Sequence, residues 1–183
     1  VNGHVDILFS GGIVKSVKPV SHAPSQIEDF EILDMGGKYA TPGLVDMHSH
    51  HLAASWPLSS SVGDTNEVSP AFGPLTPFVR VLDSMKPYDL ATKIIASGGI
   101  TSSLILPGSA NIMGGEGLMV KNFMNGGEHG GEVVEDLLLE HGVPPSSRRR
   151  YMKMACGENP RGVYKHTRMG NAWIFRKHMS RAK

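Results

Sequence analysis

Two histidines separated by a single residue offer the clearest chemistry in the sequence. They are His48 and His50, in the run VDMHSH over residues 45–50. Side chains at positions i and i+2 of an extended strand point to the same face, so both imidazoles can reach one metal ion. Imidazole nitrogen is a ligand of zinc, and a catalytic zinc site also keeps an open position for water. The spacing alone leaves two interpretations open: a metal site, or a polar surface loop that also includes His51.

The surroundings of the pair favour the metal site. The run over residues 43–48 predicts a buried strand that ends at the first histidine. Parallel α/β barrels place their active sites at the C-terminal ends of their strands, and His48 and His50 fall at such an end. His51 should point away from the pair, because successive side chains of a strand alternate between its two faces.

The segments after the pair alternate between strands and helices. Apolar and β-branched runs predict the strands; helical spacing of apolar residues, a Pro before and a Gly after predict the helices. Strands are expected over 43–48, 100–106 and 150–156, and helices over 87–96, 133–141 and 167–182, the last capped by Thr167. This alternation is typical of parallel strands joined by crossovers.

The first 40 residues follow a different pattern. Short apolar or β-branched pieces over 5–9, 13–17 and 30–33 are separated by turns, one of them at Gly11 and Gly12. They predict a small antiparallel β unit. The expected organisation is therefore residues 1–40 as the N-terminal part of a small β domain, followed by residues 41–183 as strand–helix units of an α/β domain.

Composition excludes several classes of protein. With 40% hydrophobic residues and 18 basic against 17 acidic side chains, the chain suits a soluble globular domain. No apolar run approaches the ~18–20 residues of a membrane span, and the first residues lack a signal-peptide pattern. A cytoplasmic location is the default expectation, with no membrane partner. The lone cysteine, Cys156, excludes a disulfide within the chain and is expected to be a small buried hydrophobe.

Charge is divided unevenly along the chain. Residues 1–145 hold 7 basic and 16 acidic side chains, whereas residues 146–183 hold 11 basic and 1 acidic. A basic segment can bind nucleic acid, but these cations are not interleaved with aromatic residues. A solvated surface is the favoured interpretation, and nucleic acid is not an expected partner.

A glycine-rich run over residues 108–117 is a second candidate site. Backbone N–H groups of such a run can bind phosphate. This run lacks the Gly-Lys-Ser/Thr sequence of a P-loop, and no helix clearly begins there. It is interpreted as an active-site loop in which glycine permits close backbone turns.

The run GGKYATPGLVDMHSH over residues 36–50 resembles the hallmark of the amidohydrolase superfamily, in which it closes a small β domain and forms the first barrel strand. Further segments are similar to the branch related to imidazolonepropionase, and the resemblance covers nearly the whole chain. These segments are residues 64–67, 76–77, 98–101, 106–115, 153–160 and 167–170.

The resemblance implies a metal-dependent hydrolase that acts on carbon–nitrogen bonds other than peptide bonds, in a small nitrogen-containing substrate. His48 and His50 match the first two ligands of its divalent metal, zinc by preference. The third ligand in the superfamily is often a glutamate or a carboxylated lysine. Glu158, at a strand end, is the favoured candidate, and Lys153, inside the strand, is the alternative. For each, a salt bridge or a structural role stays open.

The fold that the resemblance implies is α/β, a partial TIM-like metallo-dependent hydrolase barrel preceded by a small antiparallel β unit. Such a barrel has eight strands and typically ~250 residues, and the family's later ligands and catalytic Asp have no counterpart here. The chain is therefore expected to be a fragment, inactive and marginally folded by itself. The alternative is an inactive truncated homologue that serves as a binding or interaction protein.

Overall fold

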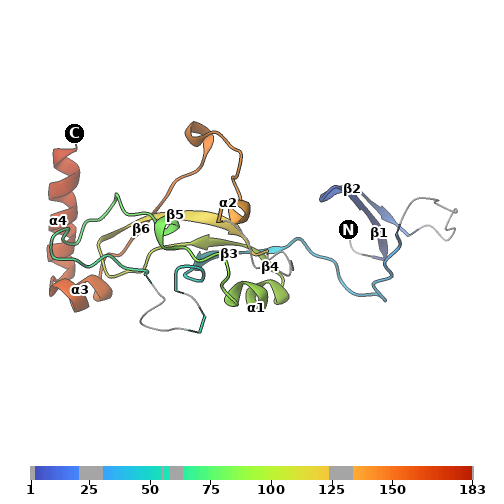
Figure 1. The fold of residues 1–183 in the computed structure, drawn as a ribbon, viewed down its shortest axis with the longest axis horizontal. Coiled ribbons are helices and arrows are strands. Elements are labelled where there is room, and N and C mark those ends of the chain that lie inside the picture. The colour runs from blue at the N-terminus through green and yellow to red at the C-terminus, as the bar shows by residue number, and fades with distance from the viewer. Residues whose placement is uncertain (1–2, 21–30, 55, 58–63, 124–133, 183) are drawn as a thin grey trace. The chain divides into compact units, whose positions relative to one another are not determined.

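The computed structural model describes residues 3–20, 31–54, 56–57, 64–123 and 134–182. It divides into two compact units, Val1–Pro42 and Gly43–Lys183 (Figure 1). The first unit is a β-hairpin, and the second is a mixed α/β unit that holds all of the helices described. No helix in the described part of the chain is long and apolar enough to cross a membrane.

The hairpin of the first unit consists of β1 (Val5–Ser10) and β2 (Ile13–Pro19), which pair antiparallel. Gly11 and Gly12 form its turn with φ angles of +57° and +75°, values that glycine adopts without steric cost. The strand expected over 30–33 is wrong for the residues described, since Glu31 to Leu33 belong to no strand. Phe30 lies outside the described residues.

The second unit is built on a four-stranded sheet in the order β3-β4-β5-β6. Its strands are β3 (Leu44–Ser49), β4 (Ile100–Ile105), β5 (Met113–Lys121) and β6 (Tyr151–Met154). β3 and β4 pair parallel, as the strand–helix alternation predicts. β5 pairs antiparallel with both β4 and β6. The expectation of parallel strands alone is therefore wrong, because the loop expected over residues 108–117 includes the first half of β5.

Glycines explain why β5 escapes sequence analysis. The strand contains Gly114, Gly115 and Gly117, where a typical strand would carry β-branched residues. A Cβ at Gly115 would lie 2.5 Å from the carbonyl oxygen of Val79, and its φ is +120°. A Cβ at Gly117 would lie 2.8 Å from the carbonyl oxygen of Ile105. The glycines therefore let neighbouring backbone approach the strand closely.

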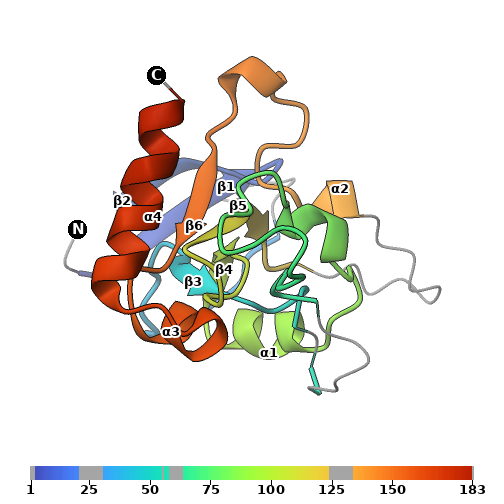
Figure 2. The same ribbon diagram turned by 90° about the vertical axis from the view of Figure 1, so that its left-hand side faces the viewer.

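The helices flank the sheet (Figure 2). They are α1 (Ala91–Ser97), α2 (Val134–Leu137), α3 (Glu158–Tyr164) and α4 (Arg168–Arg181), with 3-10 turns at Val81–Ser84 and Pro145–Ser147. The hydroxyl of Thr167 accepts the N–H of Gly170 and caps α4, as predicted. The helix expected over 87–96 begins four residues late, and that expected over 133–141 is one turn long; Val133 lies outside the described residues. α3 was not predicted.

The hydrophobic core lies on one face of the sheet. Ile105 on β4 and Val120 on β5 are fully buried, and they cluster with Leu52, Ala53, Val81, Met85 and Leu137. Alternation along β4 sends Ser103 and Ile105 to this face and leaves Leu104 for the other. At the two edge strands, Val45 and Met154 are 53% and 46% exposed. The core is therefore centred on β4 and β5.

An ion pair joins β5 to the residue before β6. The guanidinium of Arg150 donates to both carboxylate oxygens of Glu116, at 3.1 and 2.9 Å. This hydrogen-bonded cation holds the pKa of Glu116 below its ordinary value of 4.5. A carboxyl group whose pKa is lowered by folding stabilises the fold above its unfolded pKa, and the contribution is lost as pH falls through the folded pKa.

Replacing Gly115 by alanine should destabilise the sheet, because the methyl group meets the Val79 carbonyl and the residue must keep a positive φ. We expect a loss of about 1–3 kcal/mol in the free energy of unfolding, measured with urea. The matched control is Gly162→Ala in α3, where a Cβ meets nothing within 4 Å and a gain of roughly 0.4–1 kcal/mol is expected. Equal effects at the two positions would contradict the close approach described here.

Replacing Glu116 by glutamine should lower the melting temperature at pH 7, since the amide cannot balance the charge of Arg150. The difference from the wild type should shrink as pH falls below 4.5 and vanish once Glu116 is protonated in the folded protein. Thermal unfolding monitored by circular dichroism from pH 7 to pH 3 provides the measurement. Asp83→Asn, at the more exposed Arg80–Asp83 pair, is the control and should have the smaller effect. A difference that persists unchanged at pH 3 contradicts the ion pair as its cause.

Candidate metal centre

His48 and His50 lie together at the C-terminal end of β3. Their ring centroids are 5.2 Å apart and the ring planes are nearly perpendicular, at 84°. Alternation along the strand places both rings on the same side, as the two-residue spacing predicts. Two imidazoles this close can contribute nitrogen atoms to one ion.

Lys153 reaches the histidines from β6, 105 residues further along the chain. Its Nζ lies 3.0 Å from Nε2 of His48, and the residue is 7% exposed. Burial lowers the pKa of Lys153. The positive charge of Lys153 is in turn the largest cause that lowers the pKa of His48, followed by burial. A lysine ammonium only donates, so His48 is neutral and accepts through Nε2.

Backbone groups and one carboxylate fix the orientation of the pair. Nδ1 of His50 lies 2.8 Å from the carbonyl oxygen of Leu106, so Nδ1 donates to that oxygen and Nε2 is the nitrogen that remains for an ion. The carboxylate of Asp46 accepts the backbone N–H of His48 at 3.0 Å. The pairing of β3 with β4 shifts register between Asp46 and Ser49. The Asp46 side chain therefore supplies a hydrogen bond where the regular ladder is interrupted.

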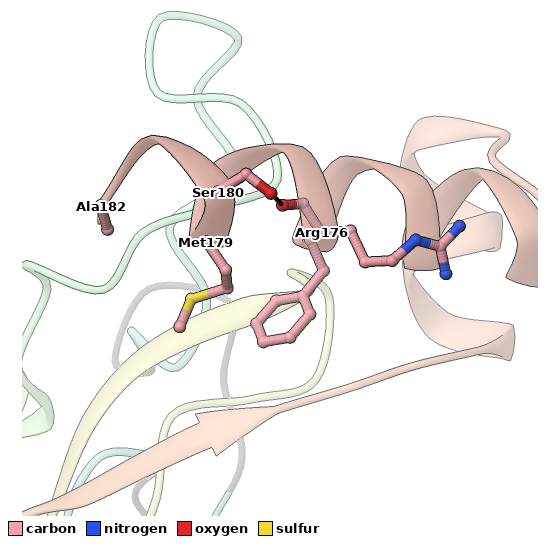
Figure 3. A pocket seen from close by; sticks show the side chains of 5 residues that line it. Arg176, Met179, Ser180 and Ala182 are labelled. Carbon is pink, nitrogen blue, oxygen red and sulfur yellow. Dashed lines mark hydrogen bonds between the residues drawn. The ribbon is translucent and has the colours of Figure 1, made fainter.

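A shallow groove runs beside His48 and Lys153. Its lining consists of these two side chains with apolar walls and a cationic rim: Leu104, Leu106, Arg150, Tyr151, Met152 and Met154. A second hollow lies beside the C-terminal half of α4, lined by Phe175, Arg176, Met179, Ser180 and Ala182 (Figure 3). There the hydroxyl of Ser180 donates to the backbone oxygen of Arg176, and no histidine or carboxylate lines it. The groove at His48 is the one with groups that can do chemistry.

Known proteins share this chain's sequence and fold. No protein-family model matches it. The amidohydrolase tasK of Hapsidospora irregularis is 40% identical over 185 residues, which cover 97% of this chain and 18% of that protein. The imidazolonepropionase of Chromobacterium violaceum is 26% identical over 160 residues, covering 79% of this chain and 38% of that protein.

A crystal structure of an amidohydrolase from Thermotoga maritima superposes with a TM-score of 0.75 and 34% sequence identity. The match covers 96% of this chain and 42% of that one. The chain belongs to the amidohydrolase superfamily. It spans less than half the length of each of these relatives, and its mixed α/β sheet is consistent with part of an amidohydrolase barrel.

The structure brings Lys153, and not Glu158, to the histidine pair of this amidohydrolase chain. Glu158 is the first residue of α3 and is exposed. Within the described ranges, no three His, Cys, Asp or Glu side chains are grouped closely enough to hold a metal ion. The expected strand over 150–156 stops at Met154, and the chain then turns into α3. The expectation that Cys156 is buried is wrong for the same reason, since it lies exposed beyond the strand.

The loop after the histidines depends on a buried carboxylate that sequence analysis did not single out. Asp89, 2% exposed, accepts backbone N–H groups from Leu52 at 2.7 Å and from Trp56 and Ala91 at 2.9 Å. Leu52 has a φ of +69°, an uncommon value for a residue with a side chain. Asp89 thereby holds a strained loop against the start of α1. An Asp two residues before a helix was the available signal.

Asp89→Asn should loosen this loop, because one of the two accepting oxygens becomes an NH₂ group that faces N–H donors. We expect a loss of about 1–3 kcal/mol in the free energy of unfolding and faster amide hydrogen exchange at Leu52 than in the wild type. Asp6→Asn, at an exposed position of β1, is the control and should leave both measurements unchanged. Unaltered exchange at Leu52 in Asp89→Asn would show that the carboxylate does not hold the loop.

Proposed function

We propose that this chain carries the first part of the active site of a metal-dependent hydrolase acting on carbon–nitrogen bonds other than peptide bonds. His48, His50 and Lys153 would hold the divalent ion. The observation that supports this most is the 3.0 Å contact between Nζ of Lys153 and Nε2 of His48, made beside His50 in a superfamily of amidohydrolases. Activity, substrate and metal of the complete protein are part of the proposal.

The donor set fits a divalent ion of the zinc type. Imidazole nitrogens are suitable ligands, and because the Leu106 carbonyl accepts from Nδ1 of His50, Nε2 is the nitrogen of His50 that can face the ion. Lys153 takes part in neither of the two ion pairs found among the described residues. Lys153 is 7% exposed as a residue, and its nitrogen contacts His48 with no carboxylate in either ion pair to balance its charge.

Lys153 supplies the third ligand in carboxylated form. An uncharged amine adds carbon dioxide and releases one proton, which leaves a carbamate with two oxygen donors. Burial, which lowers the pKa of Lys153, raises the fraction of amine that can react at neutral pH. The same burial favours conversion of a cation into a group whose negative charge the metal balances.

The residues of the groove position a substrate for hydrolysis. When bound, the ion would activate water near neutral pH and polarise the scissile group as a Lewis acid. Leu104 and Leu106 form an apolar lining beside His48, and apolar side chains lower the local dielectric constant next to a charged group. The groove suits a small nitrogen-containing molecule, and one relative in the superfamily is an imidazolonepropionase.

Metal binding by the chain tests this assignment. Metal-free chain dialysed against Zn²⁺ should retain the ion with an affinity that rises when bicarbonate is added, because bicarbonate supplies carbon dioxide for the carbamate. His48→Asn and His50→Asn should each weaken binding by about 10-fold or more, since two-ligand sites hold zinc poorly. Lys153→Met should abolish the bicarbonate dependence.

The matched control is His178→Asn, at an exposed position on α4, which should bind zinc as the wild type does. Metal content is measured by atomic emission and affinity by competition with a chromophoric chelator. Zinc retained equally by the wild type, His48→Asn and Lys153→Met would overturn the assignment of the site.

A further inference from the structure

A second group of polar side chains lies behind the histidine pair, on the core side of the sheet. It consists of Ser49, His51, Ser103 and Asn122. His51 and Asn122 are each 6% exposed, and Ser103 is fully buried. His51 points away from the pair, as strand alternation predicts, and packs beside the hydrophobic core instead of toward the groove.

Hydrogen bonds connect these four side chains in one continuous series, the polar chain, in which each donor and each acceptor can be identified. Nδ2 of Asn122 donates to the hydroxyl of Ser103 at 2.8 Å and to the carbonyl oxygen of Ile100 at 3.0 Å, which leaves Oδ1 as an acceptor. Nε2 of His51 donates to that oxygen at 3.1 Å. Nδ1 of His51 therefore has the lone pair, and it accepts the hydroxyl proton of Ser49 at 2.7 Å.

This series of hydrogen bonds ends at Ser49, the residue between the two candidate ligands. Ser49 separates His48 from His50, and the register shift just before it removes part of the regular ladder that would fix this strand end. At the other end, the backbone N–H of Asn122 donates to the carbonyl oxygen of Thr101 at 2.9 Å. The polar chain therefore ties the irregular end of β3 to the ordered start of β4 and the end of β5.

We propose that Ser49, His51 and Asn122 are positioning residues, which hold His48 and His50 in the arrangement that receives a divalent ion. This inference rests on the proposed function. None of the three side chains would touch the ion. They act through the backbone on either side of Ser49, since a displacement of that residue moves both imidazoles together.

Cobalt titration distinguishes positioning from a purely structural role. Metal-free wild type, Ser49→Ala, Ser49→Thr and Asn122→Ala are titrated with Co²⁺ in the presence of bicarbonate, and visible absorption gives affinity and ligand geometry. Ser49→Ala and Asn122→Ala should each bind about 10-fold more weakly, the size of effect typical of outer-shell partners. Ser49→Thr keeps the hydroxyl and should restore binding to within about 2-fold of the wild type.

The matched control is Asn171→Ala in α4. Asn171 is 2% exposed and its Nδ2 donates to the carbonyl oxygen of Gly157 at 3.4 Å, so its loss should lower the melting temperature and leave cobalt affinity and spectrum unchanged. Wild-type affinity and spectrum in Ser49→Ala would overturn the positioning role. The comparison of Ser49→Ala with Ser49→Thr keeps the test decisive even if Asn122→Ala does not fold.

A measurement without metal separates failure of this inference from failure of the proposed function. Long-range ¹H–¹⁵N NMR spectra report the tautomer of each imidazole. In the wild type, His50 should be protonated on Nδ1 and His51 on Nε2. In Ser49→Ala, the His50 signals should broaden or shift because the ring no longer holds one tautomer. Absence of cobalt binding by the wild type would overturn the proposed function. A sharp, unchanged His50 signal in Ser49→Ala would overturn the positioning role by itself.

Discussion

A lysine nitrogen buried against an imidazole is the constraint on which the arrangement of the sheet depends. Lys153 is 7% exposed and belongs to neither ion pair in the described part of the chain. Taking an ammonium group out of water without a carboxylate to balance its charge is costly. The surrounding backbone must therefore enforce the position of Lys153. Gly114 contributes space for it, since a Cβ there would lie 3.3 Å from Cγ of Lys153 and 2.9 Å from the carbonyl oxygen of Gly108.

Side chains alternate along β4, so one face of the sheet packs in the hydrophobic core and the other lines the groove. Ser103 and Ile105 face the core, whereas Leu104 and Leu106 line the groove beside His48. The same parity continues at the end of β3, where His48 lines the groove with His50 beside it, and Ser49 and His51 belong to the hydrogen-bonded polar group on the other face. A shift of one residue in the register of β3 would exchange the two sets. The buried hydrogen bonds of His51 can form only in the observed register, so they oppose such a shift.

Local patterns in the sequence were sufficient for the features that are local in the structure. The hairpin turn at Gly11 and Gly12, the Thr167 cap and the convergence of His48 and His50 all depend on residues close together in the chain. The sequence motif at residues 36–50 was also enough for the family. Each of these follows from backbone geometry that a few residues determine.

The features that sequence analysis missed depend on contacts between distant segments. The glycines of β5 suggested a loop, because their role as a strand requires the Val79 and Ile105 carbonyls to lie next to them. Without β5, the separation between β3 and β6 could not be known, and neither could the contact between Lys153 and His48. Glu158 opens α3, which begins four residues after Met154, the last residue of β6. Asn122 carries no sequence signature, and Asp89 carries only its position two residues before α1, because their other partners lie far along the chain.

The candidate site and the stability of the sheet therefore act against each other. An apolar residue at position 153 would remove the desolvation cost of the amine. Apolar residues at 49, 51, 103 and 122 together would remove a set of polar side chains that must satisfy one another's hydrogen bonds. The protein instead keeps the Lys153 amine of β6 against His48 on one face of β3, and the hydrogen-bonded side chains of Ser49, His51 and Asn122 on the other. A ligand that binds only the folded state returns stability in proportion to its occupancy, about 2.7 kcal/mol when its concentration is 100 times its dissociation constant. An ion bound by His48, His50 and carboxylated Lys153 would stabilise the sheet in this way, at the position where desolvation of the Lys153 amine destabilises it.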